Sequence, residues 1–497
     1  MAGILVANAA YSLRWPYIHD SPLMLYAAWH IAHGAVPYRD LFDMNMPGTY
    51  FAMWVLGAFF GWDDLGFRVF DLLCISLIGI ATFGWMRHFG RAPALAAAML
   101  FPLQYLALGP STSMQREFLA LVPLTMALAL VESPCSASVR FFGTGLLAGA
   151  AALVKPQFLL LALPPMTYLT FTAAPSADRA KGMVWMAAGL VAPFVATFAF
   201  LAYRGALDAF IDIATNYWPL YTHLTGSHQP ISGSARVAYL VTSTLEGLKN
   251  AYIPLALVGL AAALGDGQRR GLGWTIGAMT AAAAVYPSLS GQFWTYHWLP
   301  LQYMLLCAAA LSVMTVPPSR WTFRSVMRAA CALLTLAAVG TTAVRARIAA
   351  STGDPASDVV KSRARADRVP REVAAFLLAH LEPGDLVQPL DWTGGAVHGM
   401  LAARAPIATR FMYDFHFYHH VDTPYIVRLR RQFVRQLAAK RPRFVAQVLE
   451  GRPWPGGPGT TRSFPALQEL LDSDYRVVHE GETYRILERI TRAENRN

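Results

Sequence analysis

Charged residues are scarce in this chain. Only 14% of its 497 residues are Asp, Glu, Lys or Arg, and 55% are hydrophobic. Soluble globular proteins have about a quarter charged residues, so the composition excludes an ordinary soluble fold. Cysteine is scarce too: the four cysteines, at positions 74, 135, 307 and 331, stand far apart. Their spacing excludes a disulfide framework and a cysteine-based zinc motif.

Long apolar runs dominate the first two thirds of the chain. Many of them approach about 20 residues, which is the length of helix that crosses a bilayer. The first run, Met1 to Leu13, follows no basic leader, so we interpret it as a short spanning helix and not as a signal peptide. We predict about eleven spanning helices, at residues 1–13, 65–86, 94–110, 114–132, 141–154, 156–173, 183–203, 250–265, 272–289, 298–315 and 326–344.

The formal net charge of +11 comes largely from compact basic clusters in alternate loops. Loops rich in Lys and Arg stay in the cytoplasm, which predicts a multi-pass protein of the cytoplasmic (inner) membrane. Residues 14–64, 204–249 and everything after 345 then lie outside, which excludes nucleic acid as a partner. The clusters are Arg87 with Arg91, Arg140, Arg179 with Lys181, Arg269 with Arg270, and Arg320 with Arg324 and Arg328.

The last third of the chain has a different pattern. We interpret residues 1–345 as the membrane domain, 346–370 as a polar linker, and 371–497 as a small soluble extracytoplasmic α/β domain. Within this domain we predict helices around 373–378, 397–403, 425–440 and 466–471, strands at 385–390 and 444–449, and a hairpin at 475–487.

The first outer loop carries the most informative polar residues. Leu25, Ala28, Trp29 and Ala32 recur at helical spacing, which predicts a helix over residues 22–33 on the outer membrane surface. Asp20 stands at the start of this helix. One interpretation is structural: Ser21 caps the helix, Pro22 takes its first turn, and Asp20 faces the positive end of the helix dipole.

The Asp20 helix and the segment Pro37 to Asp43 (PYRDLFD) resemble the first outer loop of GT-C class glycosyltransferases, the relatives of protein O-mannosyltransferases and lipid A aminoarabinose transferases. In that class an Asp, often followed by Glu, closes the first spanning helix, and a Lys-Pro-Pro-like element follows. Here Ser21 stands in place of the Glu. The segment Asn45 to Gly48 (NMPG) replaces the second element and lacks its phosphate-contacting lysine.

The resemblance implies a GT-C-like polytopic fold and an inverting transfer. A sugar would pass from a polyprenyl-phosphate donor to a lipid, glycan or protein acceptor outside the membrane, without a cofactor. The leaving phosphate needs charge neutralisation and no proton, so a single carboxylate base, Asp20, is enough. A glycosidase, by contrast, needs two carboxyl groups flanking the bond.

Four basic side chains lie at outer helix ends, where the positive-inside rule requires none: Arg39, Arg116, Lys155 and His297. We predict that they bind the donor phosphate, and that the last three approach one cavity beside Asp20. The alternative is that each of them snorkels or forms a salt bridge, with Glu117 pairing with Arg116.

Two more carboxylates lie in the first outer loop. Asp40 and Asp43 are candidates for binding substrate hydroxyls. They are a weak metal signal because no third ligand accompanies them, so we predict no metal site. The histidines of residues 416–420 (HFYHH) likewise have no Cys or carboxylate to complete a zinc site, and we expect a loop packed on aromatic side chains.

Two other functions stay open at this point. A transporter or lipid flippase predicts inverted repeats and broken helices in matched halves, and the sequence shows no such symmetry. A catalytically inactive GT-C-like partner protein stays possible because of the departure at Asn45 and Met46.

Overall fold

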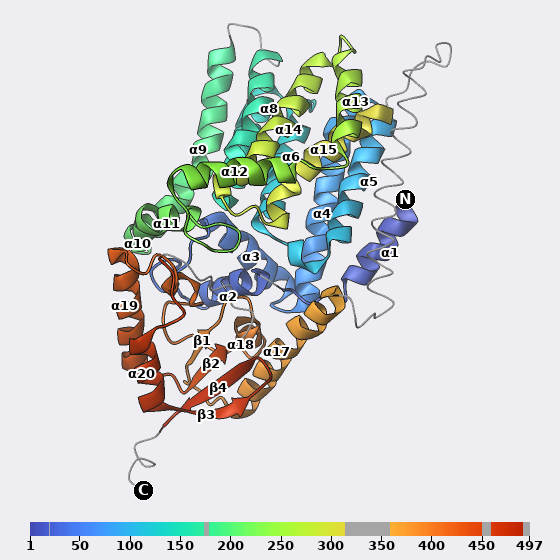
Figure 1. Ribbon diagram of the computed structural model, residues 1–497. Helices are drawn as coiled ribbons and strands as arrows, with labels where there is room; N and C mark the ends of the chain where they lie inside the picture. Colours follow the sequence, from blue (N-terminus) through green and yellow to red (C-terminus); the bar gives the residue numbers. More distant parts are fainter. Residues whose placement is uncertain (19, 173–177, 314–357, 450–458, 491–497) are drawn as a thin grey trace.

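The computed structural model describes residues 1–18, 20–172, 178–313, 358–449 and 459–490. The chain is mostly helical and has two parts (Figure 1). A helix bundle forms one part, and the C-terminal region, residues 358–490, forms the other. Figure 1 shows the helices of the first outer loop, α2 and α3, between the two parts.

The bundle follows the apolar runs of the sequence. It contains α1 (Ala2–Ser12), α4 (Asp64–Met86), α5 (Arg91–Leu108), α6 (Arg116–Val131), α7 (Ala137–Val154), α8 (Phe158–Thr172), α9 (Arg179–Tyr203), α13 (Ile253–Leu264), α14 (Arg270–Ser290) and α15 (Leu299–Ala310). Each predicted span within the described residues overlaps one of these helices, and the predicted span at 326–344 lies outside them.

Among the residues that the structure describes, four helical stretches are long and apolar enough to cross a membrane: Asp64–Phe89, Arg91–Leu108, Ala137–Val154 and Arg179–Tyr203. The chain is therefore a membrane protein, and the number of eleven spans stays a prediction. Shorter helices complete this part: α2 (Ser21–Ala32), α3 (Pro47–Phe60), α10 (Leu207–Asp212), α11 (Trp218–Thr222) and α12 (Gly233–Gly247). Helix α12 lies across the bundle (Figure 1).

Helix α2 is buried from Ser21 to Trp29, so the prediction of a helix with one face on the membrane surface is wrong in its environment. The helix packs on α3 on one side and is covered by the C-terminal region on the other, where Tyr26 Oη donates a 2.7 Å hydrogen bond to the carbonyl of Ala405. The helical spacing of its apolar residues correctly predicted a helix. The C-terminal region, and not lipid, covers the face that we expected to lie on the membrane.

The C-terminal region is an α/β unit with a mixed four-stranded sheet in the order β1-β2-β4-β3. Strands β1 and β2 are parallel, so the chain crosses between them through α18 and α19, and β3 and β4 form an antiparallel hairpin. The elements are α17 (Asp358–His380), β1 (Val387–Leu390), α18 (Ala396–Ala402), α19 (Pro424–Lys440), β2 (Phe444–Val448), α20 (Pro465–Asp474), β3 (Tyr475–Glu480) and β4 (Tyr484–Arg489).

The predicted linker needs a correction. Helix α17 begins at Asp358, so residues 358–370 are helical where we expected a polar linker. Pro370 lies inside the helix, although its missing N–H usually favours a helix start. Residues 346–357 lie outside the described part of the chain.

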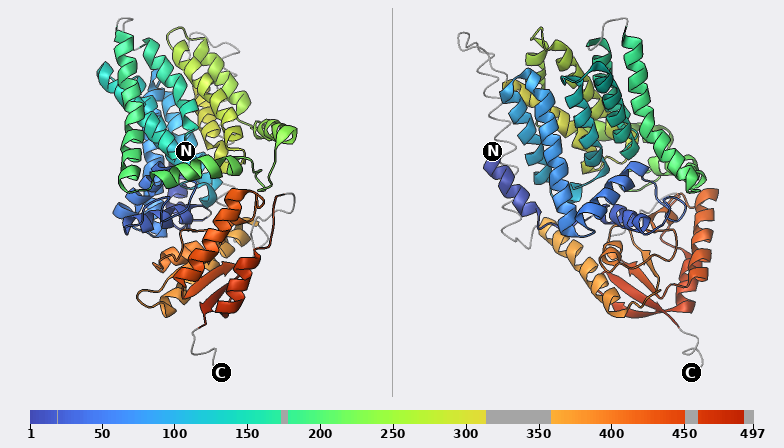
Figure 2. Two further views of the ribbon diagram at one scale, coloured as in Figure 1. Left: turned by 90° about the vertical axis from the view of Figure 1, so that its left-hand side faces the viewer. Right: turned by 180° about the vertical axis from the view of Figure 1, so that it is seen from behind.

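Polar contacts join the C-terminal region to the first outer loop. The backbone N–H of Phe42 donates a 2.6 Å hydrogen bond to the carbonyl of Arg410. Arg410 in turn donates to the carbonyl of Tyr38. Figure 2 shows that this junction lies below the helix bundle in each further view. The candidate site is built at this junction.

Candidate active site

Asp20 stands at the N-terminal end of α2 but does not cap it: in the described structure its side chain makes no capping hydrogen bond. Its Oδ2 atom accepts hydrogen bonds from Tyr296 Oη at 3.3 Å and from Arg116 Nη2 at 3.4 Å. Ser21 donates to the carbonyl of Ser113 at 3.0 Å, so it does not cap the helix as the structural interpretation required. Asp20 therefore faces α6 and the turn before α15.

A buried ion pair fixes the position of this helix end. Arg68 and Asp71 on α4 are 0% and 1% exposed, and Arg68 Nη1 lies 3.2 Å from Asp71 Oδ2. Ser113 Oγ donates to the same Asp71 oxygen at 2.8 Å, and its carbonyl holds Ser21. Arg68 also donates to the carbonyls of Trp15 and Pro16. The pair thus ties both the entry to α2 and the turn before α6 to one spanning helix.

Arg116 joins two parts of the site. This residue begins α6, and its Nη1 atom donates a 2.6 Å hydrogen bond to Asn45 Oδ1 while Nη2 contacts Asp20. Its side chain is 11% exposed. A guanidinium with five N–H groups in one plane is suited to hold two acceptors at a fixed angle.

Asp43 organises the loop that carries Asn45. Its Oδ2 accepts from Tyr50 Oη at 2.7 Å and from Asn45 Nδ2 at 2.9 Å. Its Oδ1 accepts from Tyr413 Oη of the C-terminal region at 3.0 Å. The carboxylate is 2% exposed, and these donors compensate for its burial.

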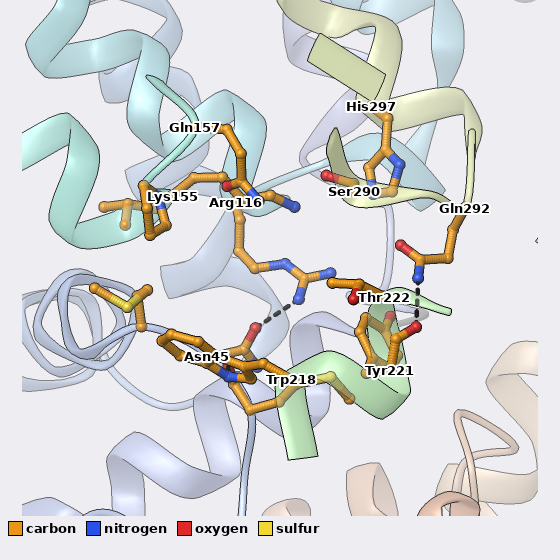
Figure 3. Close-up of a pocket in the computed structure, with 14 residues that line it drawn as sticks. Asn45, Arg116, Lys155, Gln157, Trp218, Tyr221, Thr222, Ser290, Gln292 and His297 are labelled. Atoms are coloured by element: carbon orange, nitrogen blue, oxygen red, sulfur yellow. Dashed lines mark hydrogen bonds between the residues drawn. The ribbon is translucent and has the colours of Figure 1, made fainter. Parts of the chain in front are cut away.

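A cavity of about 140 Å³ opens beside this loop (Figure 3). The sequence predicted that Arg116, Lys155 and His297 approach one cavity, and all three line it. Figure 3 shows the Arg116 side chain reaching between the loop of Asn45 and the helix of Tyr221. The lining residues are Met44, Asn45, Met46, Arg116, Val154, Lys155, Pro156, Gln157, Trp218, Tyr221, Thr222, Ser290, Gln292 and His297.

Glu117 pairs with Lys155 and not with Arg116, the partner that our alternative interpretation gave it. Lys155 Nζ lies 2.7 Å from Glu117 Oε1, which also accepts from Tyr286 Oη at 2.9 Å. His297 Nε2 lies 3.6 Å from the same oxygen. Burial lowers the pKa of His297 to about 3, which favours the neutral imidazole in this structure. The binding of a donor phosphate by His297 stays a prediction.

Three lining residues carry a buried polar atom with no hydrogen-bond partner among the described residues: Arg116 Nε, Gln157 Oε1 and His297 Nδ1. Buried polar atoms are normally paired, and each exception needs an explanation. Their location around one cavity indicates that this space receives a polar ligand.

A second, smaller cavity of about 20 Å³ adjoins the first and contains Asp20. The two cavities share Met44, Asn45, Arg116 and Tyr221 as a common wall. Asp43 lines the smaller cavity too, together with Leu23, Met24 and two residues of the C-terminal region, Trp392 and Tyr413. The guanidinium of Arg116 thus stands between a carboxylate on one side and a cavity with Lys155 on the other.

Two predicted site residues line neither of these cavities. Arg39 is 50% exposed and donates to Asp40 at 2.9 Å and to the carbonyl of Arg204 at 3.0 Å. Its hydrogen bond lowers the pKa of the Asp40 carboxyl. This pair holds the outer loop against the end of α9. Among the described residues, no group of three His, Cys, Asp or Glu side chains is placed to hold a metal ion.

Several residues of the site escaped the sequence analysis. Tyr296, next to His297, and Gln157, two residues after Lys155, stand in turns that we had singled out for their basic neighbours. Trp392 and Tyr413 gave no signal, because nothing in the local sequence indicates contact with a loop more than 300 residues earlier.

The sequence matches no protein-family model and no curated protein. Among solved structures, ArnT from Cupriavidus metallidurans bound to undecaprenyl phosphate aligns with a TM-score of 0.58 at 15% identity, over 99% of this chain and 98% of that chain. ArnT of the same organism in the apo state aligns with a TM-score of 0.55 at 14% identity, over 98% and 97%. The predicted GT-C-like fold is confirmed.

Proposed function

We propose that this chain is an integral-membrane glycosyltransferase that moves a sugar from a polyprenyl-phosphate donor to an acceptor on the outer side of the cytoplasmic membrane. One observation carries the proposal: a cavity lined by Arg116 and Lys155 adjoins a second cavity that contains Asp20. The similar structure of ArnT was obtained with undecaprenyl phosphate, which makes that lipid the first carrier to test.

The larger cavity has the chemistry to hold a phosphate. Arg116 Nε is a buried N–H donor without a described partner. Lys155 has three N–H donors, and Glu117 takes one of them. A donor phosphodiester carries one negative charge, and the phosphate gains charge when the sugar leaves. Cations that already stand in place stabilise that developing charge most effectively.

Asp20 then acts as the general base. The acceptor hydroxyl gives its proton to the Asp20 carboxylate while its oxygen bonds to the anomeric carbon. The bond from that carbon to the phosphate oxygen breaks, and the carrier phosphate leaves with the electron pair. Attack from the face opposite to the phosphate inverts the anomeric centre. The smaller cavity supports this arrangement because Asp20 and the phosphate cavity lie on the two sides of Arg116.

The fold supports an outer location of the C-terminal region. In Figure 1 this region and the start of α9 lie at opposite ends of the bundle. Arg179 begins α9, and the Arg269–Arg270 turn joins α13 to α14. Basic loops stay in the cytoplasm, so the C-terminal region and the site belong to the other side.

Binding and transfer by the purified protein in lipid nanodiscs test the proposal. We expect undecaprenyl phosphate to bind and undecaprenol, which lacks the phosphate, to bind at least about tenfold more weakly. Release of undecaprenyl phosphate from a panel of undecaprenyl-phosphate sugars, in the presence of a cell-envelope extract, measures transfer. Equal binding of the two lipids contradicts the phosphate site. Selective binding without release from any donor favours an inactive partner protein.

A further inference from the structure

The amide of Asn45 has one possible orientation in this structure. Its Nδ2 atom lies 2.9 Å from Asp43 Oδ2 and 3.2 Å from Asp43 Oδ1. The backbone N–H groups of Met44 and Asn45 also donate to Asp43 Oδ1, so this carboxylate is an acceptor. The nitrogen end of the amide therefore faces Asp43, and the carbonyl oxygen faces Arg116 Nη1 at 2.6 Å.

This orientation determines where the guanidinium of Arg116 lies. Asn45 holds Nη1, Asp20 contacts Nη2, and Nε is left for the larger cavity. With two acceptors at the Nη atoms, the guanidinium plane cannot rotate without breaking a hydrogen bond. Asn45 lines both cavities, as Arg116 does.

We propose that Asn45 is a positioning residue, which fixes Arg116 between the phosphate and the catalytic carboxylate. The inference rests on the proposed function and deepens it. A lysine at position 45 has no acceptor atom, so it cannot hold Arg116 and repels it instead. The neutral amide thus contributes through Arg116, and the missing lysine is not a sign of a lost site.

The C-terminal region takes part in this positioning. Tyr413 Oη donates to Asp43 Oδ1 at 3.0 Å, and Asp43 orients the Asn45 amide. A chain of hydrogen bonds therefore runs from Tyr413 through Asp43 and Asn45 to Arg116. Removing the negative charge of Asp43 with the isosteric Asp43→Asn substitution offers Asn45 an amide in place of a carboxylate, which allows the Asn45 amide to turn its nitrogen toward Arg116.

A double-mutant cycle on undecaprenyl phosphate affinity in nanodiscs tests the inference. We expect Asn45→Ala to weaken binding about tenfold, the effect of one hydrogen bond to a charged group, and Arg116→Gln to weaken it more. In the Arg116→Gln background, Asn45→Ala has no further effect, because Asn45 acts through Arg116. Tyr252→Phe is the matched control, since it removes a buried hydrogen bond to Gln104 away from both cavities and leaves affinity unchanged.

The Asn45→Lys variant separates the effect of added positive charge from the loss of the acceptor for Arg116. We expect it to weaken binding despite the added positive charge, because Arg116 loses its acceptor, and Asp43→Asn to weaken binding as Asn45→Ala does. Tighter binding by Asn45→Lys, or independent effects that multiply in the double variant, overturns the inference and leaves the proposed function standing. A wild-type protein that does not distinguish undecaprenyl phosphate from undecaprenol overturns the proposed function and this inference with it.

Discussion

Lys155 and Glu117 form a buried ion pair between the ends of two helices, with Nζ 2.7 Å from Oε1. Lys155 follows α7 and Glu117 lies in the first turn of α6. The lysine side chain is 11% exposed and the glutamate side chain is 0% exposed. Removing one member of such a pair leaves an uncompensated buried charge, whereas replacing both with apolar residues is often neutral.

Single and double substitutions of this ion pair can therefore distinguish an effect on stability from an effect on phosphate binding. We expect Lys155→Met alone to destabilise the protein by about 3 kcal/mol or more, and the double variant with Glu117→Met to recover most of that loss. Both should bind undecaprenyl phosphate at least about tenfold more weakly than wild type. Thermal unfolding and lipid binding on the same detergent-purified samples measure the two effects. Wild-type affinity in the double variant would mean that Lys155 is purely structural.

This pair also shows where sequence reasoning reached its limit. Lys155 and Glu117 each lay in a turn that the sequence singled out, yet the only partner we considered for Glu117 was Arg116, its neighbour. Adjacent residues on a helix point about 100° apart, and the true partner stands 38 residues away. Arg39 is the opposite case, because its partner in the structure is Asp40, the next residue in the chain.

The tight packing of α7 on α9 predicts a different effect. A Cβ atom at Gly145 would lie 2.0 Å from the carbonyl oxygen of Met186, so the two helix backbones touch. We expect Gly145→Leu to push α9 away and to destabilise the protein by about 3 kcal/mol or more. Gly277→Leu is the control, because a Cβ there meets no atom within 4 Å. Equal unfolding temperatures for the two variants in detergent would contradict the packing argument.

The histidine loop of the C-terminal region predicts a pH dependence of stability. His416 is fully buried among aromatic rings, including Phe42 at 4.8 Å, and burial lowers its pKa from 6.5 to about 3. Below pH 6.5 the unfolded chain binds a proton that the folded chain does not. Stability is therefore complete above pH 6.5 and falls by about 1.4 kcal/mol per pH unit as the pH drops toward 3.

His416→Phe should reduce this slope, and unfolding temperatures between pH 7 and pH 5 measure it. His380→Phe, at an exposed position on α17, is the control and should leave the slope unchanged. A wild-type slope in His416→Phe would show that other groups carry the dependence, among them His419, whose pKa burial also lowers.

Topology gives a prediction that does not depend on chemistry. A phosphatase that is active only outside the cytoplasm should be active when fused after Asn497, because the basic starts of α9 (Arg179) and α14 (Arg270) lie at the other end of the bundle (Figure 1). A reporter that is active only in the cytoplasm should be silent at the same position. The reverse result would place the site on the inner side and exclude the proposed transfer.

The sequence predicted more of the fold than of the site. Hydropathy located every helix of the bundle that the structure describes, and periodicity located the strands and helices after Pro370, because both signals depend on local burial. The environment of α2 and the roles of Asn45, Trp392 and Tyr413 depended on contacts between distant segments. Asn45 was the clearest case. In the motif it stood where a lysine was expected, whereas in the structure its side chain accepts a hydrogen bond from Arg116.

Replacing the carboxylate of Asp20 with an amide should greatly reduce transfer without preventing folding. Asp20→Asn keeps the volume of the side chain and an oxygen that can accept from Arg116 and Tyr296, so folding should survive. It removes the proton acceptor, and transfer should fall by about a hundredfold or more while undecaprenyl phosphate still binds. Sugar transfer, lipid binding and unfolding temperature are measured on one preparation.

Asp40→Asn is the matched control for that experiment, because Asp40 is a carboxylate of the same outer loop that lines neither cavity. It should leave transfer unchanged. A helix-capping role for Asp20 predicts the opposite pattern, a loss of about 1 kcal/mol of stability with transfer intact. Transfer near the wild-type rate in Asp20→Asn would end the assignment of Asp20 as the base, and Asp43 would become the next candidate, because it is the other carboxylate that lines the smaller cavity among the described residues.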